Sequence, residues 1–315
     1  MTDLPDAIRV ASERRRTLHD DPDQTAYRLF HGYGEGYPGV TVDRYGDVAL
    51  LSHKVEVAPA MRDAAARALL ERAPVQRVIA KQYHAVDQGV RPVSVTQLYG
   101  EPITESVEVR DHGLRFMTRL HTPESNGLFL DARPARAWIR EHASGRRILN
   151  LFAYTGSLGV AAAAGGARSV VHVDNKKNPL EIARQNHVLN GLPIDDRSLL
   201  CGNVYAHLPR ARKAGRLLDG IILDPPPQVP ANTGRRRPEG QDYGQLSSLA
   251  APVLASEGWL LCFFNRLDRT RQEMEAEVLE SAGVPLEVLW RGESGEDFPE
   301  VDQERKLRLT AFRRL

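Results

Sequence analysis

The sequence has few of the features that mark several common protein classes. Its 315 residues include two cysteines, Cys201 and Cys262, too few for a disulfide framework or a cysteine-based zinc site. No apolar run approaches the ~20 residues that span a bilayer, and the polar N-terminal stretch lacks the apolar core of a secretory signal. The ten histidines show no metal-ligand spacing. We therefore expect a cytoplasmic protein with no membrane contact and no bound metal.

Positive and negative charges are nearly balanced along the chain. There are 42 Lys and Arg residues against 41 Asp and Glu residues, which gives a net charge of +1. A protein that binds nucleic acid through overall positive charge is therefore not indicated. The basic residues still cluster near residues 210–216, 235–237 and 266–271, and phosphate backbones are bound by such patches. Solvated surface is the simpler interpretation of each cluster, and RNA contact stays a hypothesis.

The order of apolar and polar segments indicates two domains after a polar tail at residues 1–24. Short strand patterns and a helix opened by Pro59 predict a small α/β domain over residues 25–103, with possible RNA contact. A hairpin pattern around Asp111-His112-Gly113 opens the second domain, 104–315, in which strands and helices then alternate. Such alternation predicts a doubly wound, mostly parallel sheet.

The first strand of this alternation, 147–151, runs into a turn that opens a helix at Ser157. Gly156 in the turn would let a ligand approach the backbone. The next strand ends in Asp174, where a carboxylate can accept hydrogen bonds from a ribose. The dinucleotide fingerprint G-x-G-x-x-G is absent, so S-adenosylmethionine, which has no phosphate, fits better than NAD. A tight turn without a ligand is the structural alternative.

The fourth strand, 219–223, ends in Asp224-Pro225-Pro226-Pro227. Prolines fix the backbone and have no N–H, so we expect their carbonyl groups to accept from a substrate amino group. Asp224 adds a carboxylate where substrate would meet cofactor. Asp-Pro-Pro alone is usually a turn, but downstream of Asp174 it favours a methyltransferase for planar nitrogenous substrates. Pro227 stands where N6-adenine enzymes have an aromatic residue, which disfavours adenine N6.

Through these motifs the chain resembles class I S-adenosylmethionine-dependent methyltransferases that modify 23S rRNA. The resemblance runs from about residue 26 onward and includes SNGLFLDARPAR (125–136), ILNLFAYTGSLG (148–159) and DGIILDPPP (219–227). It implies a Rossmann-like α/β fold with a seven-stranded sheet and a smaller N-terminal α/β domain. It also implies S-adenosylmethionine as cofactor and RNA, 23S rRNA first, as partner. We expect a catalytic unit without the family's further RNA-binding modules.

The resemblance also implies which residues form the site. Cofactor contacts are expected from Phe129, Asp131, Arg133, Asn150, Phe152, Tyr154, Thr155, Gly156, Ser157, Asp174, Asn175, Asn203 and Asp224. Substrate contacts are expected from Asp224, Pro225, Pro226 and Asn265. An arginine of segment 125–136 could pair with the cofactor's carboxylate, and Asn203 stands where an aspartate is usual near the adenine. Lys81, at the end of a strand, could reach an RNA phosphate.

Two branches of the family differ in their chemistry. The cytosine-C5 branch uses a cysteine just past the fifth strand, where this sequence has Arg266, and Cys262 is expected in the core. Phe264-Asn265 resembles the corresponding segment of the guanine-N7 branch better. Guanine N7 is a nucleophile that loses no proton on methylation. We therefore favour guanine N7, with catalysis by proximity and alignment. Three alternatives stay open: methylation of cytosine C5, methylation of a small molecule or another RNA, and a non-catalytic RNA-binding scaffold.

Overall fold

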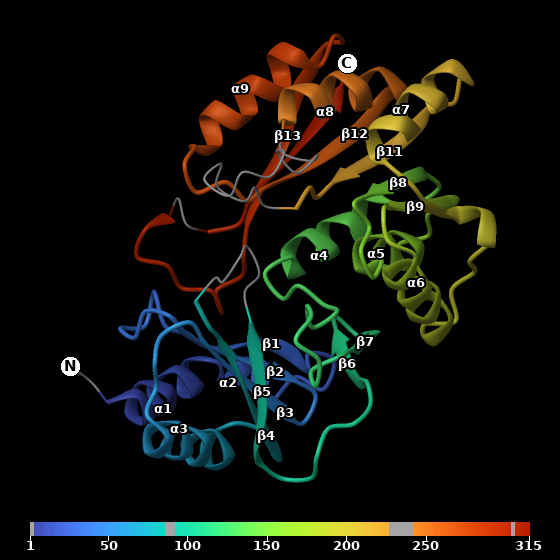
Figure 1. Cartoon of the computed structure of the whole chain (residues 1–315). Coiled ribbons are helices and arrows are strands. Elements are labelled where there is room, and N and C mark those ends of the chain that lie inside the picture. Colours follow the sequence, from blue (N-terminus) through green and yellow to red (C-terminus); the bar gives the residue numbers. More distant parts are fainter. Residues whose placement is uncertain (1–2, 86–91, 227–241, 304–305) are drawn as a thin grey trace. The chain divides into compact units, whose positions relative to one another are not determined.

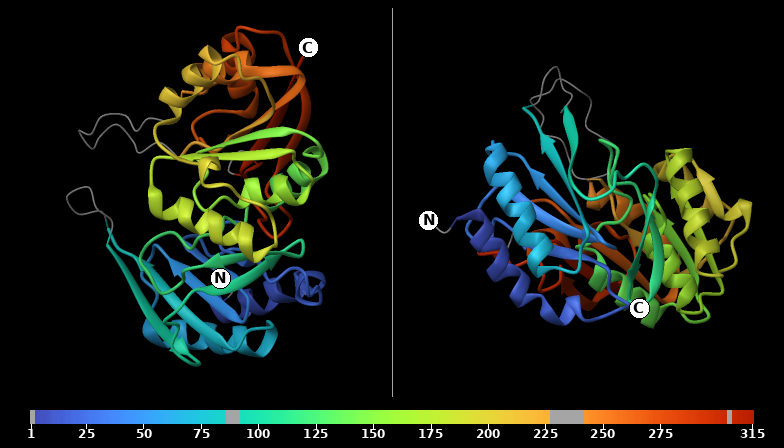
Figure 2. Two further views of the ribbon diagram at one scale, coloured as in Figure 1. Left: turned by 90° about the vertical axis from the view of Figure 1, so that its right-hand side faces the viewer. Right: turned by 90° about the horizontal axis from the view of Figure 1, so that it is seen from below.

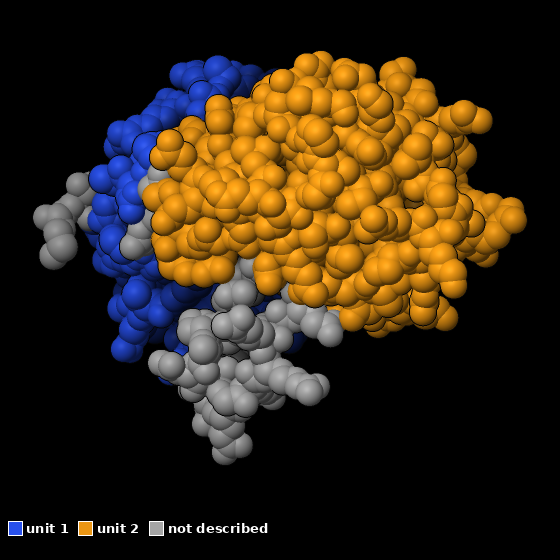
Figure 3. Space-filling model, turned by 90° about the horizontal axis from the view of Figure 1, so that it is seen from above, with its two compact units in different colours: residues 1–131, 295–303 blue, residues 132–294, 304–315 orange. Residues whose placement is uncertain are grey.

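The computed structural model describes residues 3–85, 92–226, 242–303 and 306–315. They form two compact units, coloured blue and orange in Figure 3. Unit 1 comprises Met1–Asp131 and Gly295–Gln303, and unit 2 comprises Ala132–Ser294 and Glu304–Leu315. The sequence predicts a division between residues 103 and 104, so unit 1 extends further along the chain than expected.

Unit 1 is built on a five-stranded sheet in the order β1-β2-β3-β4-β5. Its strands are Ala26–His31, Val40–Tyr45, Val48–His53, Arg77–Tyr83 and Val93–Tyr99. β3 and β4 are parallel because helix α3 (Pro59–Arg72) connects them, and the other neighbours pair in antiparallel fashion. Helix α1 (Leu4–Arg14) lies beside α3 on one side of this sheet (Figures 1 and 2), and the short α2 (Arg16–His19) follows it.

The N-terminal segment is not the polar tail that the sequence predicts for residues 1–24. Leu4, Ile8 and Ala11 are at most 1% exposed and belong to the core of the five-stranded sheet. Their spacing of three and four residues forms one apolar stripe on α1. Charged residues such as Arg9 and Glu13 fill the other side of the helix and give the segment its polar composition.

The hairpin β6 (Val107–Asp111) and β7 (Leu114–Thr118) belongs to unit 1, not to unit 2 as the sequence predicts. The backbone of Arg110 explains this placement: its carbonyl accepts from Thr25 N–H at 2.9 Å, and its N–H donates to the Thr25 hydroxyl at 2.8 Å. These bonds tie the hairpin to the residue directly before β1.

Residues 295–303 come late in the chain and complete unit 1. Asp297 is 1% exposed; its carboxylate accepts from the backbone N–H of Arg28 at 3.0 Å, and its carbonyl accepts from the Arg15 guanidinium at 3.0 Å. The Arg28 guanidinium lies 4.3 Å from the centre of the Phe298 ring. The connection between the last two strands of the chain, Leu286–Glu293 and Arg308–Arg314, therefore packs into unit 1.

Unit 2 holds a seven-stranded sheet in the order β10-β9-β8-β11-β12-β14-β13. In that order the strands are Leu199–Cys201, Ser169–Asp174, Arg147–Leu151, Leu218–Leu223, Leu254–Phe264, Arg308–Arg314 and Leu286–Glu293. The first five are parallel, and β14 runs antiparallel to both of its neighbours. The expected Rossmann-like, class I α/β architecture is confirmed.

Helices cover both faces of this sheet (Figure 1). α7 (Val204–Lys213), α8 (Tyr243–Ala250) and α9 (Arg271–Ser281) share a core with Leu149 and Leu151 of β8. The opposite face is covered by α4 (Arg133–His142), α5 (Ser157–Ala164) and α6 (Lys177–Leu189). Two short 3₁₀ turns, Asp196–Ser198 and Ala251–Val253, precede β10 and β12. In the described ranges, every helix is too short or too polar to cross a bilayer.

Replacing Ile8 with alanine should lower the free energy of unfolding by about 2–5 kcal/mol, because a side chain that is 1% exposed leaves a cavity between α1 and the sheet. Val10→Ala on the same helix is the matched control. Val10 is 51% exposed, so the change should stay within about 0.5 kcal/mol. Urea titrations of both variants measure this difference, and small equal effects would mean that α1 is the loose segment that the sequence suggested.

Candidate active site

The carboxyl ends of β8, β9 and β11 meet where the strand order of the large sheet reverses. Leu151 pairs with Val173 on one side and with Leu223 on the other. The residues that follow, Phe152, Asp174 and Asp224, therefore leave the sheet at one edge. Ligands of open α/β sheets bind outside this edge, at the point of reversal. The structure brings the two predicted strand-end aspartates to that place.

The turn after β8 has a strained backbone. Phe152 has a φ of +57°, Tyr154 of +47° and Gly156 of +76°. A left-handed conformation costs a non-glycine residue of order 1–3 kcal/mol, and strained residues of this kind cluster at functional sites. The strain fits a turn whose backbone is shaped for a ligand, and it falls within the segment that the sequence assigns to the cofactor.

Asp174 holds this turn in place. Its Oδ2 accepts a hydrogen bond from the backbone N–H of Tyr154 at 2.9 Å, and its Oδ1 accepts one from Lys176 N–H at 2.9 Å. An ionised carboxylate has about four acceptor sites, so each oxygen keeps capacity for a hydroxyl group. Asp174 is partly exposed, which leaves it accessible. This donor and acceptor pattern fits a ribose diol.

The glycines of the turn are needed for packing inside the protein. A Cβ atom at Gly156 would lie 2.6 Å from Ala183 Cβ, and one at Gly159 would lie 2.3 Å from His172 Cε1. Both positions must stay small so that α5 can pack against β9 and α6. We expected Gly156 to admit a ligand to the backbone, but its neighbours here are side chains of unit 2.

A buried polar chain lies beneath the turn. Asn150 Nδ2 lies 3.3 Å from His172 Nδ1, and His172 Nε2 lies 3.0 Å from His187 Nε2. The Asn150 amide can bond His172 Nδ1, and of the two facing Nε2 atoms one donates and the other accepts. Burial lowers the pKa of His172 to about 3 and that of His187 to about 4, so both rings are neutral. Asn150 is 1% exposed, so it supports the turn and does not face a ligand directly.

Thr155 is also a supporting residue in this structure. It is 1% exposed, and its carbonyl accepts from the buried Asn186 amide at 2.9 Å. Ser157 is the first residue of α5 and is partly exposed. The sequence analysis missed Asn186, His172 and His187, because polar residues inside strand and helix patterns give no sign of which partner they meet.

The Asp224-Pro225-Pro226 segment is joined to the end of β12. Asn265 Nδ2 donates to the carbonyl of Pro225 at 2.9 Å. Pro225 is buried, whereas Asp224 is partly exposed and Pro226 is exposed. We expected the proline carbonyls to accept a hydrogen bond from the substrate, but the carbonyl of Pro225 accepts one from Asn265. Asn265 and the Asp-Pro-Pro segment, both predicted to contact substrate, are therefore bonded to each other. Pro227 lies outside the described residues.

The neighbouring Tyr243 strengthens this edge from the side of α8. Its ring is 0% exposed, and its hydroxyl donates to the backbone carbonyl of Phe263, two residues before Asn265. Burial raises the pKa of the Tyr243 hydroxyl far above its usual range, so it stays a proton donor. The ends of β11 and β12 are thus held by two side chains, Asn265 directly after β12 and Tyr243 of α8.

Several other predicted residues have local roles in the fold. Asn203 caps α7, with its Oδ1 accepting from Tyr205 N–H at 2.7 Å, so the oxygen expected at the adenine already has one partner. Asn175 is exposed, and its carbonyl accepts from the Cys201 thiol. Arg133 is the first residue of α4 and is 8% exposed.

Two predicted cofactor residues, Phe129 and Asp131, fall in unit 1. Phe129 is 52% exposed and Asp131 is partly exposed. Lys81, also in unit 1, does not reach solvent. Its side chain is 0% exposed and its ammonium donates to Asn126 Oδ1 at 2.6 Å, so the expected contact with an RNA phosphate is wrong for this conformation.

Of the basic clusters in the described part of the chain, residues 210–216 lie away from the Asp-Pro-Pro motif, whereas residues 266–271 directly follow Asn265. Helix α7 begins after the carboxyl end of β10 and ends before the start of β11. Residues 210–216 therefore lie at the amino-terminal ends of the strands, opposite the edge that holds Asp174 and Asp224. In the cluster 266–271, Arg266 pairs with Asp268 and Arg269 pairs with Glu277. Residues 235–237 lie outside the described residues.

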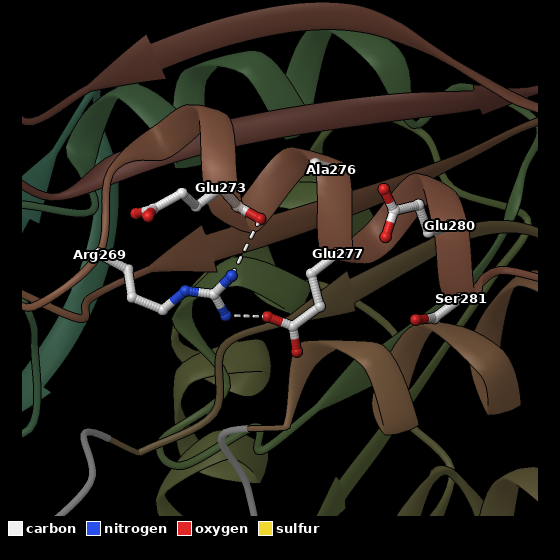
Figure 4. Close-up of a pocket in the computed structure, with 6 residues that line it drawn as sticks. All are labelled: Arg269, Glu273, Ala276, Glu277, Glu280 and Ser281. Atoms are coloured by element: carbon white, nitrogen blue, oxygen red, sulfur yellow. Dashed lines mark hydrogen bonds and ion pairs between the residues drawn. The ribbon is translucent and has the colours of Figure 1, made fainter.

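An open pocket lies along α9 (Figure 4). It is lined by Arg269, Glu273, Ala276, Glu277, Glu280 and Ser281. Arg269 donates to the Glu273 carbonyl at 3.1 Å and pairs with Glu277, so the one basic group of the lining is already used. The acidic lining does not suit a carboxylate or a phosphate, and we assign it no role.

The comparison with protein families decides the identity of the molecule. The family model that matches residues 27–313 describes S-adenosylmethionine-dependent methyltransferases. The chain belongs to this family. S-adenosylmethionine is the cofactor named in the description of this family.

The methyltransferase is similar to curated ribosomal RNA large subunit methyltransferases I. It is 32% identical over 259 residues to that of Aeromonas hydrophila, covering 81% of this chain and 65% of the relative. It is 33% identical over 251 residues to that of Erwinia tasmaniensis, covering 78% and 62%. The chain thus spans slightly less than two thirds of the length of these relatives.

Solved structures show the same fold. A SAM-dependent methyltransferase from Streptococcus mutans superposes with a TM-score of 0.85 at 24% identity, covering 98% of this chain and 80% of that chain. A methyltransferase structure complexed with SAH gives the same values. The tRNA m1G37 methyltransferase of M. jannaschii gives a TM-score of 0.58 at 16% identity, covering 98% and 78%.

The buried histidine pair makes unit 2 sensitive to acid. Both rings stay neutral in the folded state down to about pH 4, whereas an unfolded histidine takes up a proton near pH 6.5. The unfolded state therefore binds more protons between pH 4 and 6.5, and stability falls as the pH is lowered. Each histidine contributes up to about 1.4 kcal/mol per pH unit.

His187→Gln should reduce this pH dependence by about half, because one of the two buried neutral rings is removed. Urea titrations of the wild type and the variant at pH 7, 6 and 5 measure the slopes. Parallel slopes would show that the pair is not the acid-sensitive element.

Proposed function

We propose that this methyltransferase modifies a base of 23S rRNA at a ring nitrogen, with guanine N7 favoured, and without a covalent cysteine intermediate. Two observations support an RNA substrate: the curated relatives are named as methyltransferases of large-subunit ribosomal RNA, and the match covers most of this chain. The choice of a nitrogen depends on where the cysteines lie.

Both cysteines of the chain are described, and neither lies where covalent catalysis would need it. Cys262 is 0% exposed within β12, and burial raises the pKa of its thiol far above the usual range. Cys201 is exposed at the end of β10, which is three strands from β11. At ~4.8 Å between strands, that separation is about 14 Å. Cytosine C5 becomes reactive only after a thiolate adds to C6, so this arrangement favours a nitrogen nucleophile.

Guanine N7 suits the groups that are present. When bound, S-adenosylmethionine supplies an electrophilic methyl group on its sulfonium centre. The chain then has to bind and orient both partners, because N7 carries an exposed lone pair and needs no general base. The carboxylate of Asp224 can accept from the N1–H and the amino group of guanine, and a two-point contact of this kind fixes orientation. N7 lies on the other edge of the base.

The arrangement of Asn265 supports this orientation. By binding the Pro225 carbonyl at 2.9 Å, Asn265 fixes the path of the chain just after Asp224. A carboxylate on a rigid segment positions a base better than one on a flexible loop. The single observation that carries the proposal is thus an anchored Asp-Pro-Pro segment at the sheet edge, whose neighbouring cysteine, Cys262 opposite Leu223, is fully buried inside β12.

The test is to incubate the protein with unmodified 23S rRNA and labelled S-adenosylmethionine, and to identify the labelled nucleoside by mass spectrometry. We expect 7-methylguanosine. Labelled 5-methylcytidine would replace the nitrogen assignment with the cytosine-C5 alternative. Labelling confined to small molecules in a cell extract, with no labelled RNA, would overturn the RNA proposal.

Two substitutions sharpen the test. Cys262→Ala should leave kcat within about threefold of the wild type, because a buried thiol takes no part in the reaction. Asp224→Asn should lower kcat/KM by about 10- to 150-fold, the range for loss of a hydrogen bond to a charged group. Initial rates on the same RNA measure both effects. A large loss of turnover in Cys262→Ala, with unchanged stability, would contradict the non-covalent route.

A further inference from the structure

Helix α6 of unit 2 carries two buried polar residues in succession, beside the turn that follows β8. Asn186 and His187 are each 0% exposed, whereas the other buried residues of this helix are apolar: Leu180, Ile182 and Ala183. Asparagine is a poor residue for the interior of a helix, and a buried amide is unfavourable unless it is hydrogen-bonded. The contact that the Asn186 amide makes therefore indicates what the residue does.

The Asn186 amide bonds the turn 152–156 and not its own helix. Its Nδ2 donates to the carbonyl of Thr155 at 2.9 Å, across 31 residues of sequence, and the bond is buried. The helix lies directly against the turn at this place, because a Cβ atom at Gly156 would come within 2.6 Å of Ala183 Cβ. One side chain of α6 thus reaches the backbone of the turn.

Two bonds from different elements fix the path of the turn. Asp174 of β9 accepts from the N–H of Tyr154 at 2.9 Å, and this N–H belongs to the peptide group before Tyr154. Asn186 bonds the peptide group after Thr155, and the N–H of that same group donates to the Ala153 carbonyl at 2.8 Å. The peptide group between Tyr154 and Thr155 is therefore confined between two fixed neighbours.

This confinement matters because the turn is strained. Phe152 and Tyr154 have φ values of +57° and +47°, which a non-glycine residue keeps only where its surroundings impose them. The turn also lies at the switch point of the large sheet, next to Asp174, where open α/β sheets bind their ligands. Loss of the bond from α6 would let the turn relax, and the ligand site would change shape with it.

We propose that Asn186 is a positioning residue for S-adenosylmethionine, which holds the turn 152–156 from α6 in the shape that the cofactor contacts. The inference rests on the assignment of this turn to the cofactor in the proposed site. A turn that is ordered in advance raises affinity, because less conformational entropy is lost on binding. Asn186 is 0% exposed and acts through the turn, so it makes no contact with the cofactor itself.

The test compares Asn186→Ala with a variant that weakens unit 2 elsewhere. Asn186→Ala removes the amide that bonds Thr155 and keeps a residue that favours a helix. Val278→Ala is the matched control: Val278 is 0% exposed on α9, in the core on the other face of the sheet, so its truncation lowers stability away from the turn. Calorimetric titration with S-adenosylhomocysteine gives the Kd of each full-length variant, and urea titration gives its stability.

We expect Asn186→Ala to raise the Kd at least about fivefold, as loss of one buried hydrogen bond allows. Asn186→Leu, which fills the space without the bond, should bind as weakly. Val278→Ala should leave the Kd within about twofold of the wild type, even where it lowers stability more. In rate measurements on RNA, KM for S-adenosylmethionine should rise in both Asn186 variants while kcat at saturation stays near the wild-type value, which a merely structural defect would not produce.

The outcomes separate this inference from the proposed function. If the wild type binds S-adenosylhomocysteine and Asn186→Ala binds equally well, the positioning role is overturned and the cofactor assignment stands. If both variants at Asn186 lose affinity only in proportion to their loss of stability, as Val278→Ala also does, the role is overturned as well. If the wild type does not bind, the cofactor assignment fails and the positioning role fails with it. Should Asn186→Ala not fold, Asn186→Leu decides the question.

Discussion

The hydrogen bond between the Asp174 carboxylate and the backbone N–H of Tyr154 is the contact on which the candidate site depends. It joins the end of β9 to the strained turn that follows β8, and it stabilises the left-handed backbone conformation of Tyr154. Beneath it, the neutral Asn150–His172–His187 chain and the close approach of Gly159 to His172 fix the helix that follows. This edge of the sheet is therefore held by contacts within unit 2.

A second anchored segment lies across the switch point. Asn265 at the end of β12 binds the carbonyl of Pro225, so the Asp224 carboxylate stands on a rigid backbone. In unit 1, Lys81 and Tyr45 hold segment 124–128 in a similar way. In each case a side chain binds a backbone or amide group of another segment and leaves neighbouring residues exposed. Several residues that the sequence predicted to contact the cofactor, Asn150 and Thr155 among them, instead support the backbone of the turn from inside the fold.

The sequence predicted the large sheet and the strand-end aspartates well, because apolar strands and turn residues repeat along the chain. The prediction failed for residues whose contact partners in the structure are distant from them in the sequence. The apolar stripe of α1 was hidden among charged residues, and nothing local shows that residues 295–303 return to Arg15 and Arg28. Lys81 looked like a surface cation, because its acceptors in 124–126 lie more than forty residues away. Asn203 was assigned to the adenine, although Asn is also a strong helix cap.

The central claim is that Asp174 organises the cofactor site of this methyltransferase. Calorimetric titration of S-adenosylhomocysteine into the wild type, Asp174→Ala and the control Asp196→Ala tests it most directly, because Asp196 is an exposed carboxylate of the same unit. We predict that the wild type and Asp196→Ala bind equally, and that Asp174→Ala binds at least about tenfold more weakly. Equal affinity of all three proteins, or no binding by the wild type, would contradict the account.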